Sequence, residues 1–196
     1  MKHIGIDIGT SSQLSVFSPD YVEVPSLDTR PLPGGGYILV GAALCGGVSL
    51  AMLKDFFGNT VEHFTGQRPT DELLYDRMFS GSAPSQPLPV VETTFEGTRL
   101  SPSRRGSITG ISLRNFTPET LTQGFLQGVC HELHEFYQAL PPALRQGRTM
   151  LVGSGNALRR NARLRETLIA TFGLPLTLTP HAEEAALGAA LAPDAL

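Results

Sequence analysis

Apolar and polar residues recur along the chain at spacings that predict its secondary structure. Short apolar runs and runs of alternating polarity are typical of strands. They occupy residues 3–8, 13–17, 37–43, 108–113, 149–152 and 174–178. The first two runs flank a polar tip that begins with Gly9, so they predict a β-hairpin.

Apolar residues at helical spacing predict the helices, and local signals place their ends. The predicted helices run from Gly46 to Gly58, Thr70 to Phe79, Thr117 to Leu140, Ala157 to Phe172 and His181 to Leu191. Thr117 is a candidate N-cap, with Pro118 at the first helical position. Gly58 is interpreted as a C-cap, and the proline at 141 stops the long helix.

Residues 59–104 carry little core pattern beyond one short helix, and we interpret them as an irregular insertion within a single domain spanning residues 1–196. The remaining order is strands first, then alternating helices and strands. This order predicts an α/β fold of the ribonuclease H-like, actin-like ATPase kind. We expect a mixed sheet, an antiparallel hairpin and flanking helices.

Composition narrows the classes of function. With 15 Lys and Arg against 18 Asp and Glu, the net charge of −3 offers no basic field for nucleic acid or an anionic membrane. No apolar run reaches the roughly 18 residues of a membrane span, and Asp7 interrupts what a signal peptide would keep apolar. We therefore expect a cytoplasmic protein, with Cys45 and Cys130 as buried thiols.

The hairpin tip carries the first candidate site. Gly9 allows backbone N–H groups to approach a phosphate, Thr10 and Ser11 add hydroxyl donors, and the carboxylate of Asp7 is a candidate Mg²⁺ ligand. A polar hairpin turn with only local hydrogen bonds is the equally weighted alternative.

A second candidate site joins the strand at 149–152 to the following helix. It consists of Gly153, Ser154, Gly155 and Asn156, and glycines between a strand and a helix favour nucleotide binding. The spacing matches neither the dinucleotide fingerprint nor the P-loop. An ordinary tight connection remains the alternative.

Other candidates are weaker. Gly47, at the start of a predicted helix, either approaches the nucleotide or only allows close packing of helix and strand. The arginines at 159, 160, 163 and 165 are interpreted as a solvated helix face, and a nucleotide-facing role for one of them is the alternative. His131 and His134 do not have the spacing of a His-Glu-x-x-His zinc site. We find no nucleophile-and-base signature.

Several ordered motifs resemble one family, the FGGY carbohydrate kinases, and its C-terminal domain in particular. They are the segments 9–14, 34–47, 105–112, 152–156, 172–175 and 183–190. The motifs Gly-Thr-Ser-x-Gln and Gly-Ser-Gly-Asn are most similar to those of sedoheptulokinase-like members. The resemblance implies an actin-like ATPase domain with ATP in a cleft between two such domains.

The resemblance also implies roles for the residues named above. Residues 153–156 would hold the adenosine end of ATP, Gly47 would approach the nucleotide, Gly9 to Ser11 would hold phosphates, and Asp7 would be linked to Mg²⁺. Members of the family are about twice as long, and their N-terminal domain supplies the general base, so we assign no catalytic residue. The opening Gly-Ile-Asp-Ile-Gly-Thr is itself similar to the family's N-terminal phosphate motif.

Two classes of function stay open at this point. The first is the ATP- and Mg²⁺-binding half of a sugar kinase. Such a domain would either hydrolyse ATP weakly or act on a sugar when paired with a complementary half or a second copy. The second is a catalytically silent domain, truncated or engineered, in which the glycines serve only folding and the role is structural or homodimerising.

Overall fold

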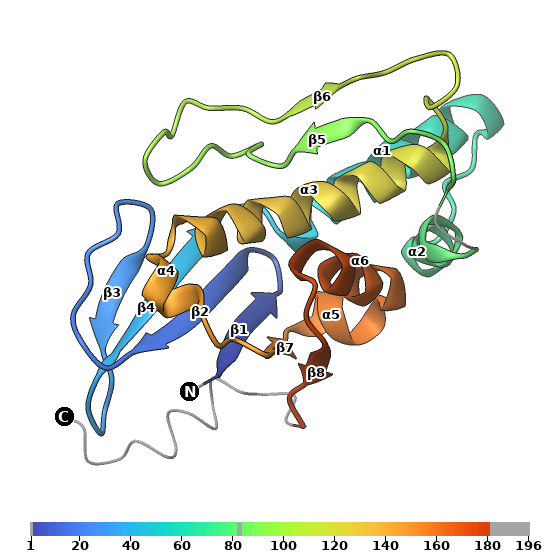
Figure 1. Cartoon of the computed structure of the whole chain (residues 1–196). Helices are drawn as coiled ribbons and strands as arrows, with labels where there is room; N and C mark the ends of the chain where they lie inside the picture. The colour runs from blue at the N-terminus through green and yellow to red at the C-terminus, as the bar shows by residue number, and fades with distance from the viewer. Residues whose placement is uncertain (1, 82–83, 181–196) are drawn as a thin grey trace.

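A six-stranded mixed sheet forms the centre of the computed structural model, which describes residues 2–81 and 84–180 (Figure 1). Its strands are β1 (His3–Ile8), β2 (Ser12–Ser18), β3 (Asp28–Pro31), β4 (Tyr37–Ala43), β7 (Met150–Ser154) and β8 (Leu176–Leu178), in the order β3-β4-β2-β1-β7-β8. Strands β1 to β4 pair antiparallel, and β7 and β8 continue the sheet in parallel from β1. The predicted hairpin and mixed α/β sheet are therefore confirmed.

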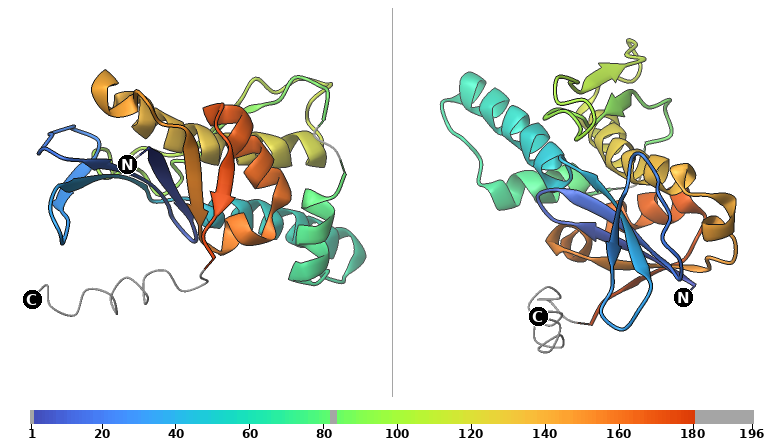
Figure 2. Two further views of the ribbon diagram at one scale, coloured as in Figure 1. Left: turned by 60° about the horizontal axis from the view of Figure 1, so that its bottom comes forward. Right: turned by 90° about the vertical axis from the view of Figure 1, so that its left-hand side faces the viewer.

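Six helices accompany the sheet in the described part of the chain. They are α1 (Gly47–Thr65), α2 (Asp71–Phe79), α3 (Pro118–Ala139), α4 (Pro142–Arg145), α5 (Asn156–Arg160) and α6 (Ala162–Phe172). The long helix α3 crosses one face of the sheet over β2 and β4 and packs against α6 (Figure 2). It begins as predicted, with a capping box between Thr117 and Thr120 and with Pro118 in the first turn.

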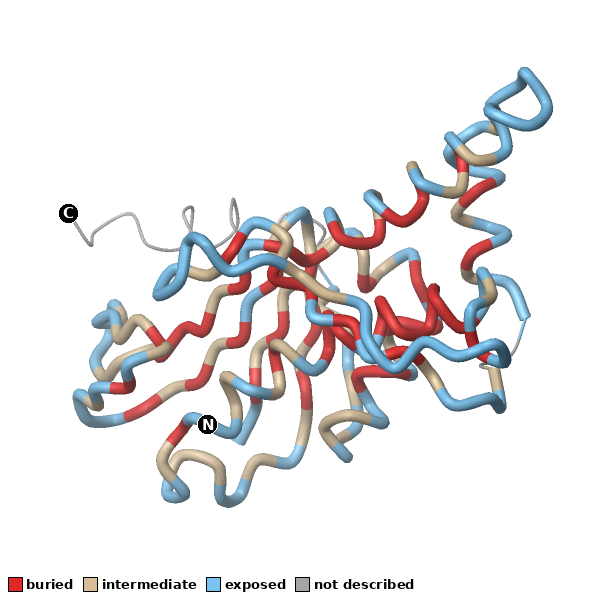
Figure 3. The backbone as a smooth tube through the Cα atoms, turned by 90° about the horizontal axis from the view of Figure 1, so that it is seen from above, coloured by how far each residue is buried: buried red, intermediate tan, exposed pale blue. Residues whose placement is uncertain are grey.

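The core lies between the sheet and α3 (Figure 3). Period-two alternation in β1 turns Ile4, Ile6 and Ile8 into this core, all at most 1% exposed. The apolar face of α3 meets them with side chains that include Leu126 and Leu133. The intervening residues of β1, Asp7 among them, lie on the other face, which leaves a half-buried carboxylate available for chemistry.

The prediction that a helix ends at Gly58 is wrong. Helix α1 continues to Thr65 and ends at Gly66, whose φ of 74° provides the left-handed cap. Gly58 is instead buried where α1 meets α2 and the side chain of Arg68, since a Cβ there would lie 3.0 Å from Leu74 Cδ1. Lack of a side chain at this position serves helix packing, which a sequence pattern cannot distinguish from a cap.

The strand predicted at residues 108–113 is mostly wrong. Only β6 (Ser107–Thr109) is extended, and it pairs with β5 (Val90–Glu92) in a separate two-stranded sheet on the outer side of α3 (Figure 1). The apolar residues that suggested a longer strand, Ile111 and Leu113, are exposed. That residues 59–104 form an insertion within one domain stays a prediction.

The helix predicted from Ala157 to Phe172 is divided in two. Asn161 leaves the helical conformation between α5 and α6, and its side chain caps α6 by accepting a hydrogen bond from Leu164 N at 3.0 Å. The helix predicted at residues 181–191 lies outside the described residues. Both cysteines are buried free thiols as predicted, and no helix in the described part of the chain is long and apolar enough to cross a membrane.

Candidate nucleotide-binding site

The parallel pairing of β1 with β7 brings the two glycine-containing turns together. Asp7 is in register with Ser154, and the Ser154 hydroxyl donates a hydrogen bond to Asp7 Oδ2 at 2.8 Å. Both strands end at this point, so the turn after β1 and the turn after β7 share one end of the sheet. Segments 147 residues apart are thus joined through the carboxylate that the sequence singled out.

The hairpin turn holds unused hydrogen-bond donors. Gly9 N–H donates to the Ser11 carbonyl at 3.0 Å, which closes the turn. Within the described residues, the N–H and hydroxyl groups of Thr10 and Ser11 donate no hydrogen bond to the protein. A Cβ added at Gly9 would meet nothing within 4 Å. These four donors are thus without a protein partner among the described residues, next to a glycine with open space beside it, which suits an anion-binding turn.

The start of α1 is fastened to this same turn. Gly47 N–H donates to the Gly9 carbonyl at 2.8 Å, and the N–H groups of Gly46 and Val48 donate to the Thr10 carbonyl at 3.0 and 3.1 Å. A side chain at Gly47 would collide with the Gly9 carbonyl oxygen. These N–H groups are occupied by the protein, so Gly47 acts here by permitting close packing beside the turn.

The connection after β7 is shorter than predicted. Gly153 and Ser154 belong to the strand, Gly155 alone makes the turn with φ of 89°, and Asn156 already begins α5. A side chain at Gly155 would collide with the Ile8 carbonyl oxygen and lie 2.9 Å from Asp7 Oδ2. Only glycine fits, because the position combines a left-handed conformation with contact against β1.

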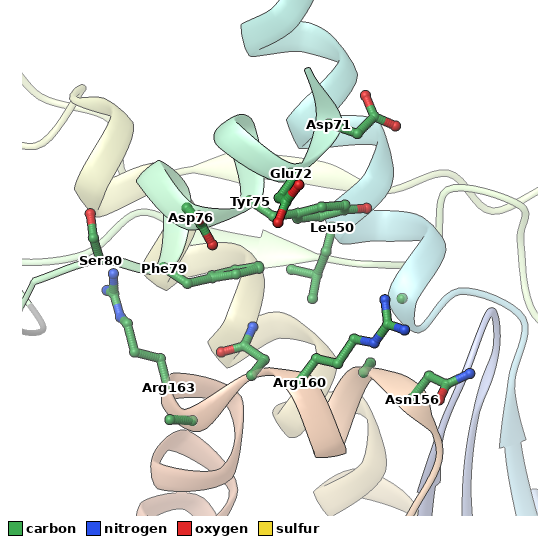
Figure 4. A pocket seen from close by; sticks show the side chains of 14 residues that line it. Leu50, Asp71, Glu72, Tyr75, Asp76, Phe79, Ser80, Asn156, Arg160 and Arg163 are labelled. Atoms are coloured by element: carbon green, nitrogen blue, oxygen red, sulfur yellow. The ribbon is translucent and has the colours of Figure 1, made fainter. Parts of the chain in front are cut away.

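A cavity of about 970 Å³ opens directly beside the two turns, between helices α1, α2, α5 and α6 (Figure 4). Gly47, Asn156 and Ala157 line it at the end nearest the turns. Tyr75 and Phe79 from α2 line it farther away. The volume lies at the upper end of the range typical of small-molecule sites, and the lining combines aromatic and polar groups as such sites do.

Comparison with known proteins agrees with this arrangement. Residues 5–193 match the C-terminal domain of the FGGY family of carbohydrate kinases. The chain belongs to this family. It is 28% identical to human sedoheptulokinase over 95% of its own length and 40% of the relative, and the mouse sedoheptulokinase gives the same values. The chain thus spans about 40% of the length of these curated kinases.

Solved kinase structures share the fold. A ligand-bound xylulose kinase from Lactobacillus acidophilus superposes with a TM-score of 0.80 at 16% identity, covering 97% of this chain and 37% of the kinase. Plasmodium falciparum glycerol kinase with ADP gives a TM-score of 0.71 at 15% identity, covering 96% and 37%. The expected ribonuclease H-like, actin-like ATPase fold of the kinase C-terminal domain is confirmed.

Helix α2 forms one wall of the cavity, and the motifs that resemble the kinase family do not predict this wall. Lys54 of α1 is almost buried, and its ammonium group lies 2.7 Å from Asp71 Oδ2 and 3.0 Å from Asp55 Oδ1. The hydrogen bond to Asp71 raises the pKa of Lys54 above its usual range, against the opposing effect of burial. The same ammonium lies 5.7 Å from the centre of the Tyr75 ring. Lys54 therefore ties α2 to α1 behind this wall.

The arginine cluster at residues 159–165 is not a simple solvated helix face. Arg163 is only 7% exposed, and it donates to the Met78 carbonyl at 3.2 Å and to Gln123 Oε1 at 2.7 Å. Arg165 donates to the Leu158 carbonyl at 2.7 Å, and Arg159 donates to Thr179. Three of these side chains thus fasten α5 and α6 to their surroundings, and the interpretation is wrong for the buried Arg163.

The residues present fit a magnesium ion bound together with phosphates. No group of three or more His, Cys, Asp or Glu side chains in the described part of the chain forms a metal cage. Mg²⁺ commonly binds through one or two carboxylates plus substrate phosphates and water. Asp7, with Oδ2 held by Ser154 beside the open hairpin turn, provides one such carboxylate.

Proposed function

We propose that this chain is the ATP- and Mg²⁺-binding part of a sugar kinase of the FGGY family. One observation carries the proposal: the parallel register of Asp7 and Ser154 places two glycine turns side by side at the edge of a cavity large enough for a nucleotide. A purely structural role would require neither the unused donors in the hairpin turn nor a cavity at that same end of the sheet.

The phosphates of ATP would lie against Gly9, Thr10 and Ser11. There the free N–H and hydroxyl groups offer donors, and the missing side chain of Gly9 leaves room. Asp7 would hold the magnesium ion, directly or through water, with Ser154 fixing the carboxylate. When bound, Mg²⁺ neutralises the charge on the phosphates, which is a principal requirement of phosphoryl transfer.

The adenosine end would lie beside Gly155 and Asn156 and extend into the cavity. Asn156 lines the cavity together with Gly47, while Gly153 and Ser154, the last residues of β7, precede it in the chain and do not line the cavity. Because Gly155 is packed against β1, it shapes the site through its backbone. This assignment matches the roles that the family resemblance implies for residues 153–156.

Transfer of a phosphoryl group to a sugar would need groups outside this chain. The curated sedoheptulokinases are about 2.5 times as long by the 40% coverage, so we expect a complementary half of the kinase to supply the sugar contacts and the base. A second copy of the domain is an alternative partner, and light scattering with and without nucleotide distinguishes the two. Cytoplasmic residence, without nucleic acid or membrane as a partner, stays part of this proposal.

Isothermal titration calorimetry with ATP, with and without Mg²⁺, tests the binding function. We expect binding heat and a rise in melting temperature, since a ligand at about 100 times its Kd adds roughly 2.7 kcal/mol to stability. Gly9→Val fills the open space in the hairpin turn and is expected to weaken ATP binding at least about 10-fold, roughly 1.4 kcal/mol, with Gly9→Ala intermediate.

A second variant isolates the metal. Asp7→Asn keeps an oxygen to accept the Ser154 hydrogen bond but removes the charge, so it should abolish the Mg²⁺-dependent part of the affinity while leaving the metal-free part. No heat and no change in melting temperature for the wild-type chain at millimolar ATP would instead support the catalytically silent alternative.

A further inference from the structure

The carboxylate of Asp7 has a second polar neighbour in the sheet, on the side opposite Ser154. Antiparallel pairing of β1 with β2 places Gln13 directly across from Asp7 (Figure 1). Residues that are paired in this way point to the same face of the sheet, with Cβ atoms about 5 Å apart. Asp7 therefore lies between Ser154 on β7 and Gln13 on β2.

The face that carries this pair is turned away from the core. The neighbours of Asp7 and Gln13 along the two strands include Ile6, Ile8 and Leu14, which are at most 1% exposed and belong to the core. Period-two alternation puts Asp7 and Gln13 on the other face, and Gln13 is exposed there. Its amide is therefore accessible to whatever binds beside the hairpin turn.

The Gln13 amide has no partner within the protein. It forms no hydrogen bond with any other residue in the described part of the chain. Asp7 accepts a hydrogen bond from Ser154 on Oδ2, whereas its Oδ1 accepts none from these residues. Two neighbouring strands thus present an unpaired carboxylate oxygen and an unpaired amide at the end of the hairpin that carries the turn.

A hydrated magnesium ion would use such an amide. Mg²⁺ keeps several waters when it binds through one or two carboxylates plus phosphates. Protein groups that hydrogen-bond to the ligands of a metal orient those ligands and strengthen binding. A glutamine can accept a hydrogen bond from a metal-bound water through its carbonyl oxygen and donate one to a phosphate oxygen through its NH₂ group.

We propose that Gln13 is a positioning residue for the metal, with its amide hydrogen-bonded to a water of the Mg²⁺ that Asp7 holds. The inference rests on the proposed function and adds a residue to the metal side of that site. Ser154 fixes one oxygen of Asp7 from β7, and Gln13 acts from β2. Because Gln13 acts through the metal, its removal changes the Mg²⁺-dependent part of the ATP affinity alone.

Calorimetric titration of ATP with and without Mg²⁺ tests this role. Gln13→Ala is expected to reduce the Mg²⁺-dependent gain in ATP affinity about 10-fold and to leave the metal-free affinity within about 2-fold. Gln67→Ala is the matched control, because Gln67 is an exposed glutamine between α1 and α2 that does not line the cavity, and it should change neither affinity. An equal loss with and without Mg²⁺ would place the Gln13 amide on the phosphates and overturn the role.

The variant Gln13→Glu provides a test of opposite sign. A carboxylate across from Asp7 repels the phosphates of metal-free ATP and attracts the metal ion. We therefore expect weaker ATP binding without Mg²⁺ and a larger gain in affinity when Mg²⁺ is added. A residue with a merely structural role would not move these two quantities in opposite directions.

The outcomes separate this inference from the proposed function. If both Gln13 variants keep the wild-type gain from Mg²⁺ while Asp7→Asn abolishes it, the role of Gln13 is wrong and the proposed function stands. If wild type binds ATP no more tightly with Mg²⁺ than without it, the metal assignment of Asp7 fails together with this inference. If wild type binds no ATP, both proposals fail.

Discussion

The two ends of the cavity are built in different ways. At the end near the turns, backbone pairing sets the geometry: β1 and β7 are in register, and the start of α1 is bonded to the hairpin turn. At the far end, the wall formed by α2 is held mainly by side chains, with Lys54 and Arg68 reaching acidic groups on α1 and α2. Backbone pairing thus fixes the end where we propose that phosphates bind, whereas side-chain ion pairs fix the α2 wall.

At the backbone-built end, we expect substitution of Gly155 to cause the largest loss of folding stability. We expect Gly155→Val to destabilise the fold by about 3–5 kcal/mol, because it places a β-branched residue in a left-handed conformation against the Ile8 carbonyl. Urea unfolding followed by circular dichroism measures the change. Gly66→Ala has a similar φ of 74° but open space around it, so it should cost only about 1 kcal/mol. Equal losses in the two variants would show that packing against β1 contributes nothing.

The same contrast explains what could be predicted from the sequence. The hairpin, the long helix with its Thr117 cap and the meeting of the two turns all follow from periodicity, capping residues and ordered motifs. The cap predicted at Gly58 is wrong because a glycine buried between two helices and a glycine at a helix C-cap give the same sequence pattern. The break at Asn161 was missed because apolar spacing continues from α5 into α6.

The sequence alone does not predict that α2 forms a wall of the cavity, and the reason is physical. Lys54 pairs with Asp71 across 17 positions, and a single exposed-looking lysine in a helix gives no indication of burial. Tyr75 and Phe79 are four positions apart, which indicates a shared helix face but not what that face borders. Site residues that depend on tertiary ion pairs carry no local pattern.

Removing the tie behind the wall should loosen α2 without unfolding the sheet. Lys54→Met keeps the aliphatic bulk and loses the ion pairs, so we expect about 1 kcal/mol of destabilisation and reduced hydrogen-exchange protection confined to α2. The raised pKa of Lys54 means that this contribution is present below pH about 10 and is lost as pH rises through the folded-state value. ATP affinity should fall with it.

A matched control tests whether burial of the ion pair determines how much stability its loss costs. Arg30 and Asp28 form an ion pair in which both side chains are about half exposed, so Arg30→Ala should cost less than about 0.5 kcal/mol. Loss of exchange protection in β1 and β7 of the Lys54→Met variant would contradict the division into a backbone-built and a side-chain-built end.

A small effect of opposite sign is expected on α3, away from both ends of the cavity. Burial raises the pKa of Glu132, although a hydrogen bond from Thr93 Oγ1 at 2.7 Å opposes the shift. The ionised carboxylate is therefore less stable in the folded chain than in the unfolded one. Glu132→Gln retains an acceptor for Thr93 and removes this cost, so it should stabilise the fold by about 0.5–1 kcal/mol at pH 7.

The pH dependence provides the decisive measurement for this variant. Because the folded pKa of Glu132 lies above the unfolded value, the advantage of Glu132→Gln should be full above the folded value and shrink to nothing as pH falls below about 4.5. A destabilised Glu132→Gln variant at pH 7 would mean that the charge itself, acting on Arg104, outweighs its burial.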